Sequence, residues 1–262
     1  MKRLISWKNF VLALFMLFVA PVAIAKDISF VQVTDIHYNQ EHKDILDKAV
    51  KDINSLEGLD FVVFTGDNID VSNKKDLEAF LKEVKGLNYP YYILVGNHDV
   101  YKRHGVAADE YMKLVKKSAG AYHPDTPNYV FKKNGYVFVV INGAKENIPG
   151  ANAYFKPSTL EWLDQTLTKY SQNNVIIFQH FPLLEARSDG HNIYNKNEYL
   201  NVLKKHSNVK AIVSGHYHEN REEMVNGIYN IVTPSLGVSK VYKLIDIDTT
   251  INFVYTMLKN FD

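Results

Sequence analysis

The chain has 262 residues, of which 46% are hydrophobic and 23% charged, a composition ordinary for a globular protein with a sizeable core. The formal net charge is +1, so composition gives no sign of a specific nucleic-acid partner. The absence of cysteine excludes disulfides, zinc-thiolate sites, thiol nucleophiles and cysteine-linked lipids.

Residues 1–25 have the form of a secretory signal peptide. Basic residues precede an apolar run at residues 10–20, and an Ala-x-Ala pattern ends at Ala25, where we expect cleavage. Loss of three basic residues would change the formal charge from +1 to −2 (Lys2, Arg3 and Lys8). An uncleaved membrane anchor is the alternative, but the run is shorter than the roughly 20 residues of a span, and a proline follows it. The sequence thus predicts an exported protein, periplasmic or extracellular, that meets a membrane only through its export signal.

From residue 26 onward, short apolar runs typical of buried strands alternate with segments whose apolar residues recur at helical spacing. In this part, strands are predicted at residues 28–34, 61–64, 91–95, 129–131, 136–141, 175–178 and 211–213. Helices are predicted at residues 43–56, 74–84, 107–118, 158–170 and 196–206. The tail is predicted to contain strands at residues 221–225, 228–232, 241–247 and 252–257, with no helix between them.

No internal repeat or linker interrupts this pattern, so residues 26–262 are predicted to form one domain. A first part that alternates strands and helices, followed by a tail of strands, combines α/β and α+β character. It favours two packed β-sheets of mixed strand direction, flanked by helices.

Side chains that bind metal ions follow five of the predicted strands, at the carboxyl ends where open α/β sheets place their sites. The segments are Asp35-Ile36-His37, Gly66-Asp67-Asn68, Gly96-Asn97-His98-Asp99, His180 and Gly215-His216-Tyr217-His218. The candidate metal ligands among them are Asp35, His37, Asp67, Asn97, His180, His216 and His218. Seven oxygen or nitrogen ligands are too many for one tetrahedral ion. They suit two ions about 3.5 to 4 Å apart that share one carboxylate.

A single histidine is more often a surface or core residue than a ligand. Here, however, five of the ten histidines stand in these motifs, each just past an apolar strand, which favours metal binding for that set. The remaining ones are interpreted as ordinary surface or core residues: His42, His104, His123, His191 and His206.

The ordered set of motifs resembles that of the calcineurin-like metallophosphoesterase family, over essentially the whole mature chain. The resemblance implies a four-layer αββα sandwich, with a two-metal centre in a groove above the strands and with the strands after His218 in the second sheet. It implies that one ion is held by Asp35, His37 and His218, that Asp67 bridges, and that the other ion is held by Asn97, His180 and His216. It also implies that His98 protonates the leaving oxygen or steadies the developing charge, that Asp99 orients His98, and that a metal-bridging hydroxide attacks phosphorus.

At several positions the sequence differs from the residues that are typical of particular branches of the family. Asp70 stands where purple acid phosphatases have a tyrosine ligand, and Asp99 stands where protein serine/threonine phosphatases have glutamate. His98 replaces the arginine of the lipid A diacylglucosamine hydrolases. With these branches set aside, the motifs most resemble those of the bacterial class III phosphodiesterases. Residues 179–182 differ from that group, because they read Gln-His-Phe-Pro where the group usually has His-His-Pro.

The sequence therefore favours a two-metal hydrolase that acts on a small-molecule phosphodiester. Its cofactors would be two divalent or trivalent ions, such as manganese, iron or zinc, because the ligand set contains no sulfur. A phosphomonoesterase such as a nucleotidase is the alternative, since the metal site alone does not choose between the two esters. A non-catalytic metal-binding protein is a further alternative, although no ligand has been lost. The oligomeric state is left open.

Four other side chains are candidates for substrate contact: Tyr38, Tyr217, Arg187 and His191. Each tyrosine is adjacent to a ligand pair, but tyrosines also pack as strand residues. Arg187 and His191 belong to a polar loop that follows His180, and such loops carry specificity in many enzymes. The plainer interpretation of these two is that they are solvated loop residues.

Overall fold

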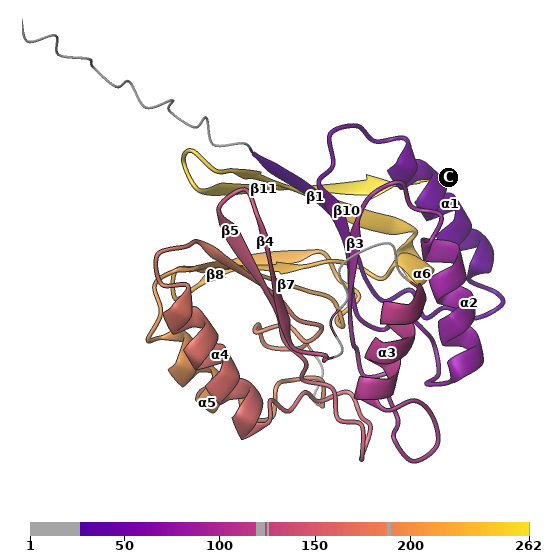
Figure 1. The fold of residues 1–262 in the computed structure, drawn as a ribbon, viewed down its shortest axis with the longest axis horizontal. Coiled ribbons are helices and arrows are strands. Elements are labelled where there is room, and N and C mark those ends of the chain that lie inside the picture. Colours follow the sequence, from indigo (N-terminus) through magenta and orange to yellow (C-terminus); the bar gives the residue numbers. More distant parts are fainter. Residues whose placement is uncertain (1–26, 119–123, 125, 188–189, 262) are drawn as a thin grey trace, which may run out of the picture.

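A computed structural model describes residues 27–118, 124, 126–187 and 190–261. Two β-sheets pack face to face, and helices cover their outer faces, so the chain forms four layers (Figure 1). The predicted αββα sandwich is therefore confirmed. The predicted signal peptide lies outside the described residues. Of the helices in the described part of the chain, none is long and apolar enough to cross a membrane.

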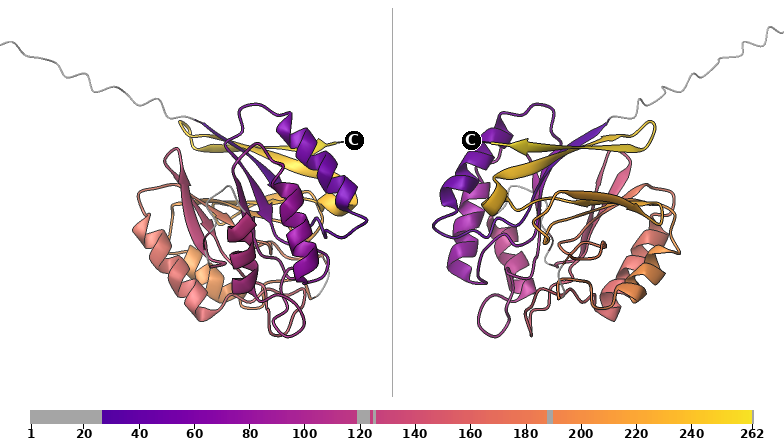
Figure 2. Two further views of the ribbon diagram at one scale, coloured as in Figure 1. Left: turned by 45° about the vertical axis from the view of Figure 1, so that its right-hand side comes forward. Right: turned by 180° about the vertical axis from the view of Figure 1, so that it is seen from behind.

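The first sheet has the strand order β11-β10-β1-β2-β3. Its strands are β1 (Ile28–Val33), β2 (Phe61–Thr65), β3 (Tyr91–Leu94), β10 (Val241–Asp248) and β11 (Phe253–Asn260). Strands β1, β2 and β3 are parallel, whereas β10 and β11 run antiparallel to their neighbours. The helices on its outer face are α1 (Lys43–Asn54), α2 (Lys74–Val84) and α3 (Ala108–Ser118), as the two further views show (Figure 2).

The second sheet has the order β4-β5-β6-β7-β9-β8. Its strands are β4 (Tyr129–Lys133), β5 (Tyr136–Val140), β6 (Val175–Phe178), β7 (Val209–Ser214), β8 (Arg221–Val225) and β9 (Ile228–Val232). Strands β5, β6, β7 and β9 are parallel, while β4 and β8 pair antiparallel at the edges. Helices α4 (Pro157–Lys169) and α5 (Lys196–Leu203) cover its outer face (Figure 2).

The tail departs from prediction in two ways. The strands after His218 do not all join the second sheet, because β10 and β11 return to the first sheet beside β1. A short helix, α6 (Leu236–Ser239), also interrupts the strands that were predicted to follow one another without a helix. Alternating apolar residues identify a strand but not its partner, and a four-residue helix is too short to show periodicity.

The two sheets are joined by a cluster of phenylalanines. Phe30 and Phe61 of the first sheet stack with ring centroids 4.8 Å apart. Phe138 of the second sheet meets both edge-on, at 6.0 and 5.2 Å, and stacks on Phe178 at 5.6 Å. All four rings are at most 2% exposed. This cluster fixes the relative position of the sheets, whose carboxyl ends carry the candidate site.

Replacing Phe138 by alanine should destabilise the fold strongly, because it removes a fully buried ring and leaves a cavity. We expect the free energy of unfolding of residues 26–262 to fall by about 3 to 5 kcal/mol in equilibrium urea unfolding. The matched control is Phe253→Ala on β11, where the ring is 53% exposed. This control should change the free energy by no more than about 0.5 kcal/mol. Equal losses in the two variants would contradict the assignment of the core.

Candidate metal centre

The loops that follow β1, β2, β3, β6 and β7 meet at one edge of the sandwich and bring the seven predicted metal ligands together. Backbone hydrogen bonds join the loops to one another. The Asp35 N–H donates to the Gly66 carbonyl at 3.0 Å, and the His37 N–H donates to the Asp67 carbonyl at 3.0 Å. The Gly215 N–H donates to the His180 carbonyl, also at 3.0 Å. The strands therefore set the spacing of the ligands before any ion binds.

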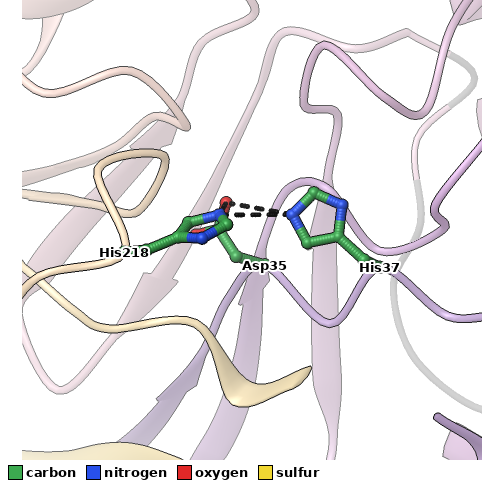
Figure 3. A group of neighbouring side chains, drawn as sticks. All are labelled: Asp35, His37 and His218. Atoms are coloured by element: carbon green, nitrogen blue, oxygen red, sulfur yellow. Dashed lines mark hydrogen bonds and ion pairs between the residues drawn. The ribbon is translucent and has the colours of Figure 1, made fainter. Parts of the chain in front are cut away.

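One group of ligands comprises Asp35, His37 and His218, which point toward one another (Figure 3). The Nε2 atoms of His37 and His218 are 3.2 Å apart, and His218 Nε2 lies 3.2 Å from Asp35 Oδ1. His37 Nε2 lies 3.9 Å from the same oxygen. Ligands that each stand about 2.1 Å from one ion lie roughly 3 to 4 Å from each other. These distances therefore fit a single cation.

A second group comprises Asp67, His180 and His216. Asp67 Oδ2 lies 3.2 Å from His180 Nε2 and 4.0 Å from His37 Nε2, so this oxygen faces both groups. Its other oxygen, Oδ1, accepts a hydrogen bond of 2.8 Å from the backbone N–H of His98. One oxygen of Asp67 is thus fixed by the protein, while the other lies where a carboxylate shared by two ions is needed.

Four buried ligand atoms have no hydrogen-bond partner: Asp35 Oδ1, Asn97 Oδ1, His180 Nε2 and His216 Nε2. A buried polar atom without a partner costs about 1 to 3 kcal/mol, and folded proteins rarely tolerate several in one place. Cations would satisfy all four atoms together. The residues present therefore fit a group of two metal ions, and Asn97 joins the set through its amide oxygen.

The backbone at these positions is strained. Positive φ angles are found at Asp35 (51°), His37 (48°), Asp67 (50°), His216 (68°) and His218 (54°). Elsewhere in the described residues, the non-glycine positions with positive φ are Asn134, Asn226, Asn252 and Lys240. Asparagine, aspartate and histidine enter this region more readily than other non-glycine residues, but each such position still costs about 1 to 3 kcal/mol, and positions of this kind cluster at functional sites.

At two glycines of the motifs, Gly96 and Gly215, neighbouring atoms lie too close for any side chain. A Cβ on Gly96 would lie 2.2 Å from Asp67 Oδ1, and a Cβ on Gly215 would lie 1.9 Å from the Thr34 hydroxyl. Neither residue has a positive φ, so glycine is needed at both positions for space and not for its backbone freedom. Both glycines instead leave room for the ligand carboxylates.

The charges of the site are strongly coupled. Burial opposes protonation of His180, but the carboxylates of Asp67 and Asp35 outweigh burial and raise the pKa of its imidazole to about 9. Burial likewise opposes ionisation of Asp67, but His180 above all lowers the pKa of this carboxyl well below its usual range. Burial lowers the pKa of His216 to about 3. Without a cation, His180 therefore carries a proton at neutral pH and His216 is neutral.

His98 is exposed beside this cluster, and its ring is held by a backbone group. Its Nδ1 lies 2.7 Å from the carbonyl oxygen of Asp70. Because a carbonyl only accepts, Nδ1 carries the hydrogen and Nε2 is left to exchange a proton with a ligand. The motifs did not reveal this contact, since any residue at position 70 supplies a carbonyl.

Asp99 plays a different part from the one predicted. Its Oδ1 accepts hydrogen bonds from the backbone N–H groups of Asn68 and Ile69, and its Oδ2 accepts one from Gly96. Burial and the nearby charge of Asp67 raise its pKa to about 7. Asp99 therefore does not orient the His98 ring through a direct bond. It holds the loop that carries Asp70, because backbone donors surround its carboxylate.

A cavity of about 320 Å³ opens over the ligands and includes Arg187, His191, Tyr217 and Glu219 in its lining. The Tyr217 hydroxyl donates to the Leu184 carbonyl at 3.0 Å, so it holds the neighbouring loop. Arg187 lies 2.8 Å from a Glu219 carboxylate oxygen. Tyr38 is 4% exposed and packs against Phe80, so its predicted place near the groove was wrong.

Comparison with known proteins shows the family. Residues 28–220, well over half of the chain, match the family model for calcineurin-like phosphoesterases. The chain belongs to this family. The family is one of phosphoesterases, and the ligand set suits metal-dependent hydrolysis of a phosphoester.

Relatives and solved structures agree with this assignment. The chain is 25% identical over 221 residues to a 3′,5′-cyclic-nucleotide phosphodiesterase of Nostoc sp., covering 79% of this chain and 78% of the relative. It is 25% identical over 227 residues to a probable glycerophosphodiester phosphodiesterase of Arcobacter nitrofigilis, covering 78% and 77%. A dimetal phosphatase from Danio rerio has the same fold, with a TM-score of 0.66, 17% identity and coverage of 89% and 96%.

Binding of Mn²⁺ to the metal-free chain should release about one proton near neutral pH, because His180 must lose its proton before Nε2 can act as a ligand. The apparent affinity should therefore rise with pH toward about 9, the pKa of His180. Calorimetry in two buffers of different ionisation enthalpy measures the proton, and elemental analysis should find about two ions per chain. In His180→Gln, Mn²⁺ binding should release fewer protons, and the variant should bind less metal. The control His206→Gln should behave like the unaltered chain. An affinity independent of pH would contradict the prediction.

Proposed function

We propose that this protein is an exported, two-metal-dependent phosphodiesterase that acts on a small-molecule phosphodiester. The observation that carries the proposal is the convergence of four buried ligand atoms that have no hydrogen-bond partner, at Asp35, Asn97, His180 and His216. When bound, two divalent ions such as manganese, iron or zinc supply positive charge to the phosphoryl oxygens and activate water as the nucleophile. Export rests on the form of residues 1–25 and places the substrate in the periplasm or the medium.

His98 acts on the leaving alcohol. The Asp70 carbonyl holds the hydrogen of Nδ1, so the proton that moves is the one on Nε2. Water forms a new P–O bond, and the P–O bond to the alcohol breaks with its electron pair on the alcohol oxygen. That oxygen takes the proton from Nε2, and the proton lost by water returns to His98 through solvent. One diester and one water therefore give one monoester and one alcohol.

Two observations favour diesters over monoesters. The curated relatives named above are phosphodiesterases, one of cyclic nucleotides and one probably of glycerophosphodiesters. In addition, among the described residues that line the cavity over the ligands, Arg187 is the one lysine or arginine, and it is paired with Glu219. A monoester dianion would bring a second negative charge, and the described lining offers it no unpaired lysine or arginine.

The test uses residues 26–262, stripped of metal and reloaded with Mn²⁺. Rates are compared on bis-p-nitrophenyl phosphate, a diester, and on p-nitrophenyl phosphate, a monoester. We expect metal-dependent turnover with a higher kcat/KM for the diester. A preference for the monoester would make the protein a phosphomonoesterase instead. Two bound ions without turnover of either ester would favour the non-catalytic metal-binding protein.

Replacing His98 by alanine should lower kcat by about a hundredfold or more, the usual effect of losing a general acid. Metal content should stay at the level of the unaltered chain, because only the backbone N–H of His98 contacts a ligand carboxylate. The loss should be larger for an alkyl leaving group than for p-nitrophenol, which leaves readily without a proton. His206→Ala is the control, since His206 contacts Asp164 and neither residue lines the cavity over the ligands. An unchanged rate with alkyl esters would remove His98 from the mechanism.

A further inference from the structure

A second cavity, of about 650 Å³, adjoins the metal centre at Asn97 and His98. Loops at residues 70–72, 97–104 and 149–151 line it. It shares Asn97, His98 and Ala151 with the cavity over the metal centre. The exposed His98 ring thus stands at the boundary between the two cavities, with the ring of His37 at a centroid distance of 4.6 Å.

We propose that this second cavity is the subsite for the leaving alcohol, and that this alcohol is uncharged and carries a ring. The inference rests on the proposed phosphodiesterase function and names the substrate class of that same site. A displacement at phosphorus is in line, so the leaving oxygen departs on the side opposite the attacking water. The metal ligands surround the first cavity. An alcohol that leaves past His98, which gives it a proton, therefore enters the second cavity.

The cavity is an open groove, and its volume of about 650 Å³ leaves room for a ring-sized group. Its wall also offers aromatic surface. The rings of Tyr101 and His104 meet edge to face at a centroid distance of 5.0 Å. Val71, whose side chain is 64% exposed, adds apolar surface at the opening. Aromatic and apolar walls of this kind bind flat ring systems.

The charge of the lining selects against an anionic alcohol. Among the described residues that line the second cavity there is neither lysine nor arginine, and the carboxylate present is that of Asp70. The Asp70 carboxylate is 44% exposed, and its Oδ1 lies 3.8 Å from His37 Nδ1. A second phosphate or a carboxylate on the alcohol would lie against this carboxylate, and no lysine or arginine of the described lining would balance it. A neutral nucleoside or aryl alcohol avoids that repulsion.

The walls of the cavity are held in place by hydrogen bonds between the loops. The Lys102 N–H donates to the Glu146 carbonyl at 2.8 Å. The Val106 N–H donates to the Ser72 hydroxyl at 2.9 Å. The Gly105 N–H donates to the Tyr101 carbonyl at 2.7 Å and closes the turn between these two residues. The shape of the subsite is therefore set before a substrate arrives, which lowers the cost of binding.

The test replaces Gly150, which lines the second cavity, by phenylalanine in order to fill that cavity. A Cβ at Gly150 would have Lys145 Nζ as its nearest neighbour, at 3.6 Å, and the backbone there needs no glycine, so the variant should fold. We expect its KM for bis-p-nitrophenyl phosphate to rise roughly tenfold, the scale of a lost apolar contact. The inhibition constant of inorganic phosphate should not change, because phosphate needs only the metal centre. Ile148→Phe is the matched control in the same loop, outside the lining and 78% exposed.

A binding experiment on the metal-free chain separates this inference from the proposed function. Amide signals of isotope-labelled protein are followed during titration with 4-nitrobenzyl alcohol and with 4-carboxybenzyl alcohol. We expect the neutral alcohol to shift the signals of Val71, Tyr101 and Gly150, and the anionic alcohol to shift them much less.

The shifts by the neutral alcohol should be lost in Gly150→Phe and kept in Ile148→Phe. Such a result supports the subsite even if neither ester is hydrolysed. Unshifted signals, or an unchanged KM in Gly150→Phe, would overturn the subsite. Equal shifts by the two alcohols would overturn its preference for an uncharged group.

Discussion

The structure depends above all on holding several carboxylates and imidazoles within a few ångströms of one another in a buried place. Asp67 lies at the centre of this arrangement, with one oxygen bonded to the His98 backbone and the other facing His180 and His37. Unpaired ligand atoms and strained backbone at the same residues are costs that the rest of the fold must offset. The phenylalanine cluster between the sheets and the hydrogen bonds between the loops hold the ligands there.

The same constraint explains several residues that bind nothing themselves. Gly96 and Gly215 are small because the carboxylates of Asp67 and Asp35 occupy the space that a side chain would fill. Asp99 gathers backbone N–H groups from both motif loops, so the loops keep their spacing. Through the Asp70 carbonyl, this arrangement also decides which nitrogen of His98 carries the exchangeable proton. Ligand geometry and proton transfer are thus consequences of the same loop packing.

Chemistry at the metal centre and recognition of the substrate are divided between the two sides of His98. The first cavity contains the ligands and a paired arginine, whereas the second is bounded by Tyr101, His104 and Val71. The second cavity is built partly from the loops that carry Asp67 and Asn97 and partly from residues 149–151, which contribute no metal ligand. Residues 149–151 can therefore vary without disturbing the ions, which is how one fold serves different alcohols.

The sequence by itself determined the two-sheet fold class, most of the strands and helices, and the set of residues that gather at the site. It could do so because strand burial and ligand chemistry are properties of short segments. Only the tertiary structure decided that β10 and β11 join the first sheet, that Asp99 holds a loop rather than the His98 ring, that Tyr38 is buried, and that a second cavity lies beside His98. These features are contacts between segments far apart in the chain, many through backbone groups that every residue carries, so no local pattern records them.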